Sequence, residues 1–172
     1  MSPAAPWRTR PERPGDAPAI HVVTAAAFPT EAEAHLVDAL REDPSAWIPE
    51  LSRVAVDDTG EIIAHALLTR CTVGGEPALA LAPCSVLPDH QGQGAGTAAI
   101  RAALEAARGR GENLVVVLGH PRYYPRFGFT PASADGITAP FEAPGDAFLA
   151  LRLDPGARAP RGPIRYPAAF GL

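Results

Sequence analysis

The sequence predicts an α/β fold in which strands and helices alternate along the chain. Residues 79–87 form an apolar strand that runs through a glycine-rich loop into an alanine-rich helix over about 95–108. A second apolar strand, 114–118, follows this helix. Earlier in the chain, two segments with strand character flank the turn 57–60, which is typical of a hairpin. Together these patterns predict helices packed against one central sheet.

The first part of the chain is expected to contain two helices and then the hairpin. Asp16 can cap a helix that continues to about Ala27, because its carboxylate can accept from free N–H groups of the first turn. Residues 30–33, Thr-Glu-Ala-Glu, match a capping box that opens a helix to about Glu42. Residues 51–56 and 61–72 are the expected hairpin strands.

The second part is expected to end in a strand and an extended tail. Residues 109–111, Gly-Arg-Gly, are a usual stop for the preceding helix. Residues 148–153 predict a late strand, and the tail after Asp154 is rich in proline and glycine. The chain contains no repeat and no linker long enough to divide it, so we expect residues 1–172 to form a single domain.

Composition limits the classes of function. The net charge of -4 provides no basic field for nucleic acid or anionic membranes. No apolar run approaches the length of a membrane span and no signal-peptide core is present, so a cytoplasmic location is expected. Cys71 and Cys84 are too few for a disulfide framework or a cysteine zinc site, and we expect buried thiols and no metal.

The loop between strand 79–87 and the following helix indicates an anion site. Its sequence, Pro-Asp-His-Gln-Gly-Gln-Gly-Ala-Gly over residues 88–96, contains three glycines in five positions. Glycines let the backbone approach a ligand closely, and the first turn of a helix has N–H groups without helical partners. These donors and the helix dipole favour a phosphate. The loop therefore predicts a nucleotide-like cofactor.

Two other phosphate loops fit less well. A P-loop needs a lysine that reaches the terminal phosphates, and this chain contains no lysine. Residues 94–99 satisfy the dinucleotide pattern G-x-G-x-x-G/A. That pattern requires an acidic residue after the next strand, where this chain has Gly119, His120 and Pro121, and it belongs at the first βα turn of its fold. A dinucleotide-dependent oxidoreductase is therefore a remote alternative.

The loop and a later motif resemble one known family. Gln91-x-x-Gly94-x-Gly96 resembles the acetyl-CoA loop of GNAT-superfamily N-acetyltransferases, and the segment 124–129, Tyr-Pro-Arg-Phe-Gly-Phe, matches the family's tyrosine and Gly-Phe turn. The similarity is greater to the YhbS-like subfamily and extends over residues 7–170. Its further marks are Ile63-Ala64-His65, Leu79-Ala80-Leu81-Ala82-Pro83, Val116 to Pro121, and Tyr166-Pro167-Ala168-Ala169-Phe170.

The resemblance implies a fold and a way of binding acetyl-CoA. The fold would be a mixed, mostly antiparallel central sheet that splays between strands 4 and 5 and is flanked by helices, with a short first strand near residues 7–10. The diphosphate would bind the backbone of the loop, and pantetheine would pair with the splayed strand. The residues implied are Cys84, Ser85, Val86, Gln91, Gly92, Gln93, Gly94, Ala95, Gly96 and Thr97.

The resemblance also implies a catalytic residue. Tyr124 occupies the family's general-acid position, and a phenol with a pKa near 10 is protonated at neutral pH. His120 and His65 are the candidates for a general base, although His65 in an apolar strand also fits a core histidine. The chain departs from the family at the cofactor-binding asparagine before the tyrosine, where residues 119–122 are Gly-His-Pro-Arg.

The expected function is acetyl transfer from acetyl-CoA to a primary amine by direct attack in a ternary complex. A non-catalytic acyl-CoA sensor or scaffold is the alternative from another class. The acceptor stays open: neutralising a lysine at pH 7 costs about 4 to 5 kcal/mol, whereas an α-amine costs under about 1 kcal/mol. A homodimer also stays open, and neither nucleic acid nor membrane is expected as a partner.

Overall fold

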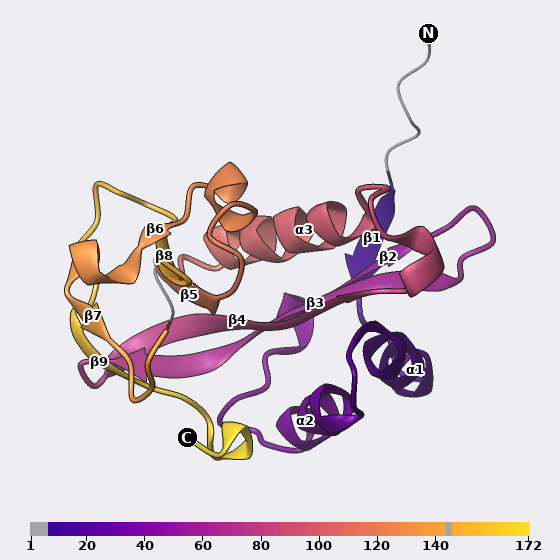
Figure 1. The fold of residues 1–172 in the computed structure, drawn as a ribbon, viewed down its shortest axis with the longest axis horizontal. Helices are drawn as coiled ribbons and strands as arrows, with labels where there is room; N and C mark the ends of the chain where they lie inside the picture. The colour runs from indigo at the N-terminus through magenta and orange to yellow at the C-terminus, as the bar shows by residue number, and fades with distance from the viewer. Residues whose placement is uncertain (1–6, 144–145) are drawn as a thin grey trace, which may run out of the picture.

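The computed structural model describes residues 7–143 and 146–172, which are arranged as three layers. A sheet of nine strands, counted over these residues, forms the middle layer. Figure 1 shows helix α3 on one face of the sheet, and α1, α2 and the C-terminal segment on the other. The α/β class that the sequence predicts is confirmed.

The elements follow one another as the sequence pattern indicates, with small shifts of their bounds. The first half contains β1 (Arg8–Pro11), α1 (Ala17–Ala27), α2 (Ala32–Arg41), β2 (Ser52–Val56), β3 (Ile62–Val73) and β4 (Glu76–Val86). The second half contains α3 (Ala95–Gly109), β5 (Leu114–Leu118), β6 (Thr130–Pro131), β7 (Ile137–Thr138), β8 (Phe148–Arg152) and β9 (Gly162–Arg165). The tail expected to be merely extended thus contributes β9, which pairs with β3 and β7.

The sheet is mixed and mostly antiparallel, and it forks between β4 and β5. Its strand order is β1-β2-β3-β4-β5-β8-β6, and of these neighbours only β4 and β5 run parallel. β4 and β5 pair over just two positions, Leu79 with Val115 and Ala80 with Val116. β4 continues to Val86 and β5 to Leu118 without pairing to each other. This confirms the splayed sheet that the family resemblance implies.

The predicted helix caps do not form as expected. Asp16 precedes α1, but its carboxylate accepts from the Arg10 guanidinium at 2.6 Å and from the Arg13 backbone N–H at 2.7 Å, so it makes no cap bond. The capping box at 30–33 was also wrong, because Glu31 stands at the N-cap position and the helix starts one residue later than a box headed by Thr30 requires.

Alternating side chains of β4 and β5 divide the core between the two faces. Leu79 and Val115 belong to the cluster that packs on α3. Ala80 and Val116 belong to a cluster on the other face, beside β7, β9 and Tyr166. A third cluster lies under α1 and α2. Among the described residues, none of the helices has the length and apolarity needed to cross a bilayer.

Candidate active site

The glycine-rich loop forms one wall of a cavity of about 480 Å³ at the N-terminus of α3. The lining residues are 90–92 and 94–97, together with Val86, Tyr123 and Arg126. The first helical bond of this end runs from the Ala98 N–H to the Gly94 carbonyl at 3.0 Å. The N–H groups of residues 95–97 therefore precede the helical ladder and are available to a ligand in the cavity. This arrangement suits a phosphate.

Glycine is required at two positions of the loop, for a different structural reason at each. Gly94 has φ +86°, a left-handed conformation that side chains rarely adopt, and it turns the chain into α3. Gly96 lies against the end of β4, where an added Cβ would be 2.8 Å from a methyl carbon of Val86. The backbone of the loop consequently approaches β4 more closely than any side chain would allow.

Tyr123 and Arg126 complete the cavity, although neither is among the cofactor-binding residues that the family resemblance implies. The Tyr123 hydroxyl hydrogen-bonds the Thr97 hydroxyl at 2.8 Å, which ties the segment after β5 to the start of α3. The Arg126 guanidinium lies 4.2 Å from the centre of the Tyr123 ring and donates from Nε to its carbonyl at 2.8 Å. A cation is thus held at the rim of the cavity. Both residues lie within two positions of Tyr124, and this closeness to the family's tyrosine is the signal in the sequence that points to them.

The glutamines of the loop differ in their placement. Gln91 lines the cavity, whereas Gln93 is outside the lining and accepts a hydrogen bond at its carbonyl from Trp7 Nε1 at 2.8 Å. The Trp7 ring also meets His90 edge to face, with centroids 6.2 Å apart. Trp7, at the start of the described residues, therefore holds the loop in place through these two contacts.

The last residues of β4 present one free edge. Cys84 pairs with Ala66 of β3, and Ser85 pairs with His65. The Ser85 hydroxyl is buried and lies 3.3 Å from the hydroxyl of Thr24 in α1. The edge of residues 84–86 that faces β5 has no strand partner among the described residues. Backbone groups on this edge can pair with an extended ligand.

Tyr124 stands between the ends of β4 and β5. Its ring packs so closely on Gly119, directly after β5, that a Cβ there would be 2.3 Å from a ring carbon. On the other side its hydroxyl faces the thiol of Cys84. Burial raises the pKa of Tyr124, with a smaller contribution from Cys84, so the phenol is protonated at neutral pH. Burial likewise raises the pKa of Cys84 to about 12.

The two candidate bases occupy different surroundings. His65 is fully buried, and its Nε2 lies 2.8 Å from the Ser52 hydroxyl, which itself donates to Glu12 at 2.7 Å. Ser52 therefore accepts from Nε2–H, which leaves Nδ1 as a buried acceptor without a partner among the described residues. Burial lowers the pKa of His65 to about 4. His120 is exposed after β5, and its carbonyl accepts from the backbone of Tyr123 and Tyr124.

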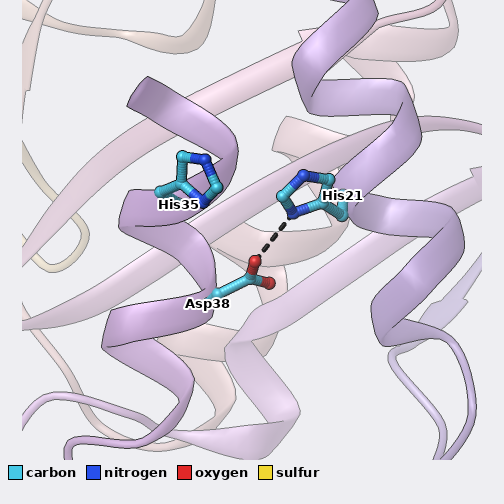
Figure 2. A group of neighbouring side chains, drawn as sticks. All are labelled: His21, His35 and Asp38. Carbon is cyan, nitrogen blue, oxygen red and sulfur yellow. Dashed lines mark hydrogen bonds and ion pairs between the residues drawn. The ribbon is translucent and has the colours of Figure 1, made fainter. Parts of the chain in front are cut away.

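Away from the loop, α1 and α2 are joined by a group of polar side chains (Figure 2). His21 Nδ1 lies 2.7 Å from an Asp38 oxygen, and the rings of His21 and His35 meet edge to face at 5.4 Å. Asp38 also accepts from Arg41 at 3.3 Å. The Asp38 carboxylate raises the pKa of His21. Because the histidine and Arg41 already satisfy this carboxylate, the group acts as an ion-pair network between the helices.

Comparisons with known proteins agree with this geometry. A family model described as "Acetyltransferase (GNAT) family" matches residues 18–129. The uncharacterized N-acetyltransferase YhbS of Escherichia coli strain K12 is 33% identical over 164 residues, covering 94% of this chain and 96% of the relative. The uncharacterized N-acetyltransferase YjhQ of the same strain is 44% identical over 134 residues, covering 75% of this chain and 73% of the relative.

Solved structures show the same similarity over nearly the whole chain. The crystal structure of YhbS from Escherichia coli in complex with CoA has a TM-score of 0.86 at 32% identity, covering 100% of this chain and 96% of that one. A GNAT acetyltransferase from Brucella melitensis in complex with acetyl-CoA has a TM-score of 0.77 at 34% identity, covering 95% and 97%.

The chain belongs to the GNAT family of N-acetyltransferases. The remote alternative of a dinucleotide-dependent oxidoreductase does not hold, because its glycine fingerprint belongs to a doubly wound parallel sheet. In this chain the fingerprint-like residues 94–99 follow β4 of a mostly antiparallel sheet. The glycine spacing alone could not separate the two folds.

Proposed function

We propose that the protein transfers the acetyl group of acetyl-CoA to a primary amine by direct attack in a ternary complex. The observation that carries this proposal is the arrangement of three features: the cavity of about 480 Å³ at the start of α3 (the phosphate cavity), the free edge of β4 beside it, and a protonated tyrosine in the fork. Relatives of at least 32% identity bind CoA or acetyl-CoA in their crystal structures, which supports the same ligand here.

The loop would hold the diphosphate through backbone groups. The N–H groups of residues 92–97 would donate to the phosphates, with Arg126 as a cation at the rim. Pantetheine would extend along Cys84, Ser85 and Val86 and pair with the backbone edge that faces β5. Since these contacts would involve main-chain atoms, they would not depend on the side chains at 84 and 85. The missing family asparagine then costs one side-chain contact, and Gly119 at this stretch instead leaves room for the Tyr124 ring.

Tyr124 would act on the departing sulfur. When the neutral amine attacks the thioester carbonyl, the carbon–sulfur bond breaks and negative charge develops on sulfur. The Tyr124 hydroxyl can donate a hydrogen bond to that sulfur and then its proton, while the new ammonium group loses a proton to solvent or a base. The raised pKa of Tyr124 makes it a weaker acid than free phenol, so the hydrogen bond to developing thiolate is the larger part of its role.

The base would be an exposed group or water. His65 is enclosed and has a pKa of about 4, so its buried Nδ1 suits a structural role better than proton removal from a solvent-borne amine. His120 is exposed directly after β5 and is the candidate that both solvent and an amine can reach. A water chain could serve equally, and we assign no side chain to this step.

An acceptor screen tests the proposal. Primary amines of several classes would be incubated with acetyl-CoA while the free thiol of coenzyme A is followed, and the acetylated product identified by mass. Because the chain has no lysine, self-acetylation of side-chain amines cannot mimic turnover. We expect at least one amine to give thiol release and product together. Tight acetyl-CoA binding with no acetylated product from any class would instead support the non-catalytic sensor or scaffold.

A further inference from the structure

An apolar cavity of about 170 Å³ lies at the base of the fork between β4 and β5. Its floor is formed by residues 80–82 of β4 and 116–118 of β5, and its walls by Phe141, Tyr166, Phe170 and Leu172. Apart from the Tyr166 hydroxyl, the lining side chains are hydrocarbon. No residue of the family motifs at the phosphate loop takes part in it.

Most of this cavity's lining lies on the face of the sheet opposite to α3, although Leu81 and Val117 of its floor belong to the cluster on the α3 side. Ala80 and Val116 on its floor belong to the core cluster that includes Tyr166, and their neighbours Leu79 and Val115 face α3. Phe170 on its wall packs against the cluster under α1 and α2. Figure 1 shows the C-terminal segment on this side of the sheet and α3 on the other. The phosphate cavity and the apolar cavity are thus separated by the fork.

The arrangement separates the routes of the two substrates. A thioester that enters from the phosphate loop along the free edge of β4 would carry its carbonyl into the fork. An amine that attacks this carbonyl then has the opposite face as its approach, where the apolar cavity opens. Leu118, half of whose surface is exposed, stands at the rim of that opening.

We propose that this cavity binds an uncharged apolar group of the acceptor amine, an alkyl or aromatic group about the size of a benzene ring. The inference rests on the proposed acetyl transfer and names the class of its acceptor. A dry, apolar cavity of about 150 Å³ is large enough for benzene, so the volume here fits such a group.

The lining disfavours acceptors with further positive charges. None of its lining side chains carries a carboxylate, and an ammonium group moved from water into hydrocarbon surroundings without a partner is strongly destabilised. The adjoining cavity of about 410 Å³ shares Tyr166 and Leu172 with this one and is lined by Arg165, whose charge repels a second ammonium. Polyamines and lysines flanked by basic residues are therefore poor acceptors under this proposal.

Matched amines test the preference by turnover. Propylamine, butylamine and pentylamine differ only in alkyl length, whereas 1,5-diaminopentane has the length of pentylamine with a second ammonium. We expect kcat/KM to rise about fourfold per added methylene until the cavity is filled. The diamine should be at least about tenfold worse than pentylamine, since one charge must lose its water. Equal rates for the whole series, or a preference for the diamine, would overturn the proposal.

A charge placed at the rim should change the preference. Leu118→Glu adds a carboxylate beside the opening, and Val22→Glu adds the same group on α1 at a site of similar exposure, 62% against 50%. Leu118→Glu should improve the ratio of diamine to pentylamine by about two- to fivefold, the size of an exposed ion pair. Val22→Glu should leave the ratio unchanged. An equal effect of both variants would show that the rim does not select the acceptor.

Two further measurements separate this proposal from the proposed function. Binding of pentylamine and of the diamine in the presence of coenzyme A can be followed by ligand-observed NMR without any turnover. Selective binding of pentylamine with no acetylated product would support the cavity and contradict acetyl transfer. The second measurement is the rate of turnover with acetyl-, butyryl- and hexanoyl-CoA. A rate that rises with acyl length and is indifferent to the amine would assign the cavity to the acyl chain and overturn the acceptor assignment.

Discussion

The two sides of the fork between β4 and β5 are built from different parts of the protein. On the α3 side, one continuous loop supplies most of the phosphate cavity, and it does so with backbone N–H groups. On the other side, the apolar cavity is assembled from two strands, Phe141 and the segment after β9, and it presents side chains. Under the two proposals, cofactor recognition is therefore a property of local backbone shape, whereas acceptor recognition depends on which side chains meet across the fold.

This difference predicts how each side responds to substitution. The loop should tolerate changes of exposed side chains such as Gln93, but not an added Cβ where the backbone touches a neighbour. The apolar cavity should tolerate changes at its rim with an altered preference and little loss of fold. The fork itself, where Tyr124 bridges β4 and the end of β5, serves both sides.

The largest effect is expected at the fork. Tyr124→Phe removes the hydroxyl that would act on the departing sulfur, so kcat should fall by about 10² to 10⁴ while the dissociation constant of acetyl-CoA barely moves. Tyr123→Phe is the matched control, because it removes the neighbouring hydroxyl that only joins Thr97. Steady-state kinetics and calorimetry on both variants measure this. A Tyr124→Phe enzyme within threefold of wild-type kcat would show that the ring only packs.

A second, smaller effect is expected on the α3 side. Gly96→Ala places a Cβ 2.8 Å from Val86, so loop and strand must move apart, and acetyl-CoA affinity should fall about tenfold or more. Gly109→Ala makes the same change at the far end of α3, where nothing lies within 4 Å of the added Cβ. It should keep full affinity and melt slightly higher. Equal acetyl-CoA affinity in the two variants would show that the loop does not bind the cofactor.

The rim cation should contribute less than the loop backbone. Arg126→Gln removes the positive charge held over the Tyr123 ring, and acetyl-CoA affinity should fall about three- to tenfold, the size of one exposed contact to a phosphate. The difference between wild type and variant should shrink as salt is raised, because salt screens such contacts. Calorimetry at two salt concentrations tests this. A salt-independent difference would mean that Arg126 acts only through packing.

The smallest effect is expected on the stability of α1 and α2, the helices on the face of the sheet opposite to α3. The Asp38 carboxylate raises the pKa of His21 above its ordinary 6.5, so the pair stabilises the fold fully below pH 6.5. That contribution disappears as pH rises through the raised pKa. Wild type should therefore melt a few degrees above His21→Gln at pH 6, and the gap should close toward pH 9. His35→Gln, which keeps the pair, is the control. A gap that stays constant with pH would exclude the ion pair as its cause.

The parts of this fold that sequence predicts well are those with local causes. β5 is an uninterrupted apolar run whose bounds match the prediction, and the glycine loop with α3 has a start and a stop signal within a few residues. The cofactor side of the site follows from the same local signals. The cap expected at Asp16 failed because its carboxylate pairs with Arg10, a contact that no local pattern contains.

The parts that sequence does not predict depend on distant contacts. β6, β7 and β9 are short, β6 and β9 contain proline, and all three exist because another strand lies beside them. The apolar cavity needs residues from 80 to 172 brought together. Tyr166 and Phe170 belong to one of the segments that resemble the family. Their position beside the fork, however, is seen only in the folded chain.

The most direct test of two substrates meeting across the fork measures acetyl-CoA affinity and the pentylamine-to-diamine ratio in the same two variants. Gly96→Ala acts on the loop, and Leu118→Glu acts at the rim of the apolar cavity. We predict that Gly96→Ala weakens acetyl-CoA about tenfold or more and leaves the ratio unchanged, whereas Leu118→Glu lowers the ratio and leaves acetyl-CoA affinity within about twofold. Both quantities changing together in either variant would contradict separate sites on the two faces of the sheet.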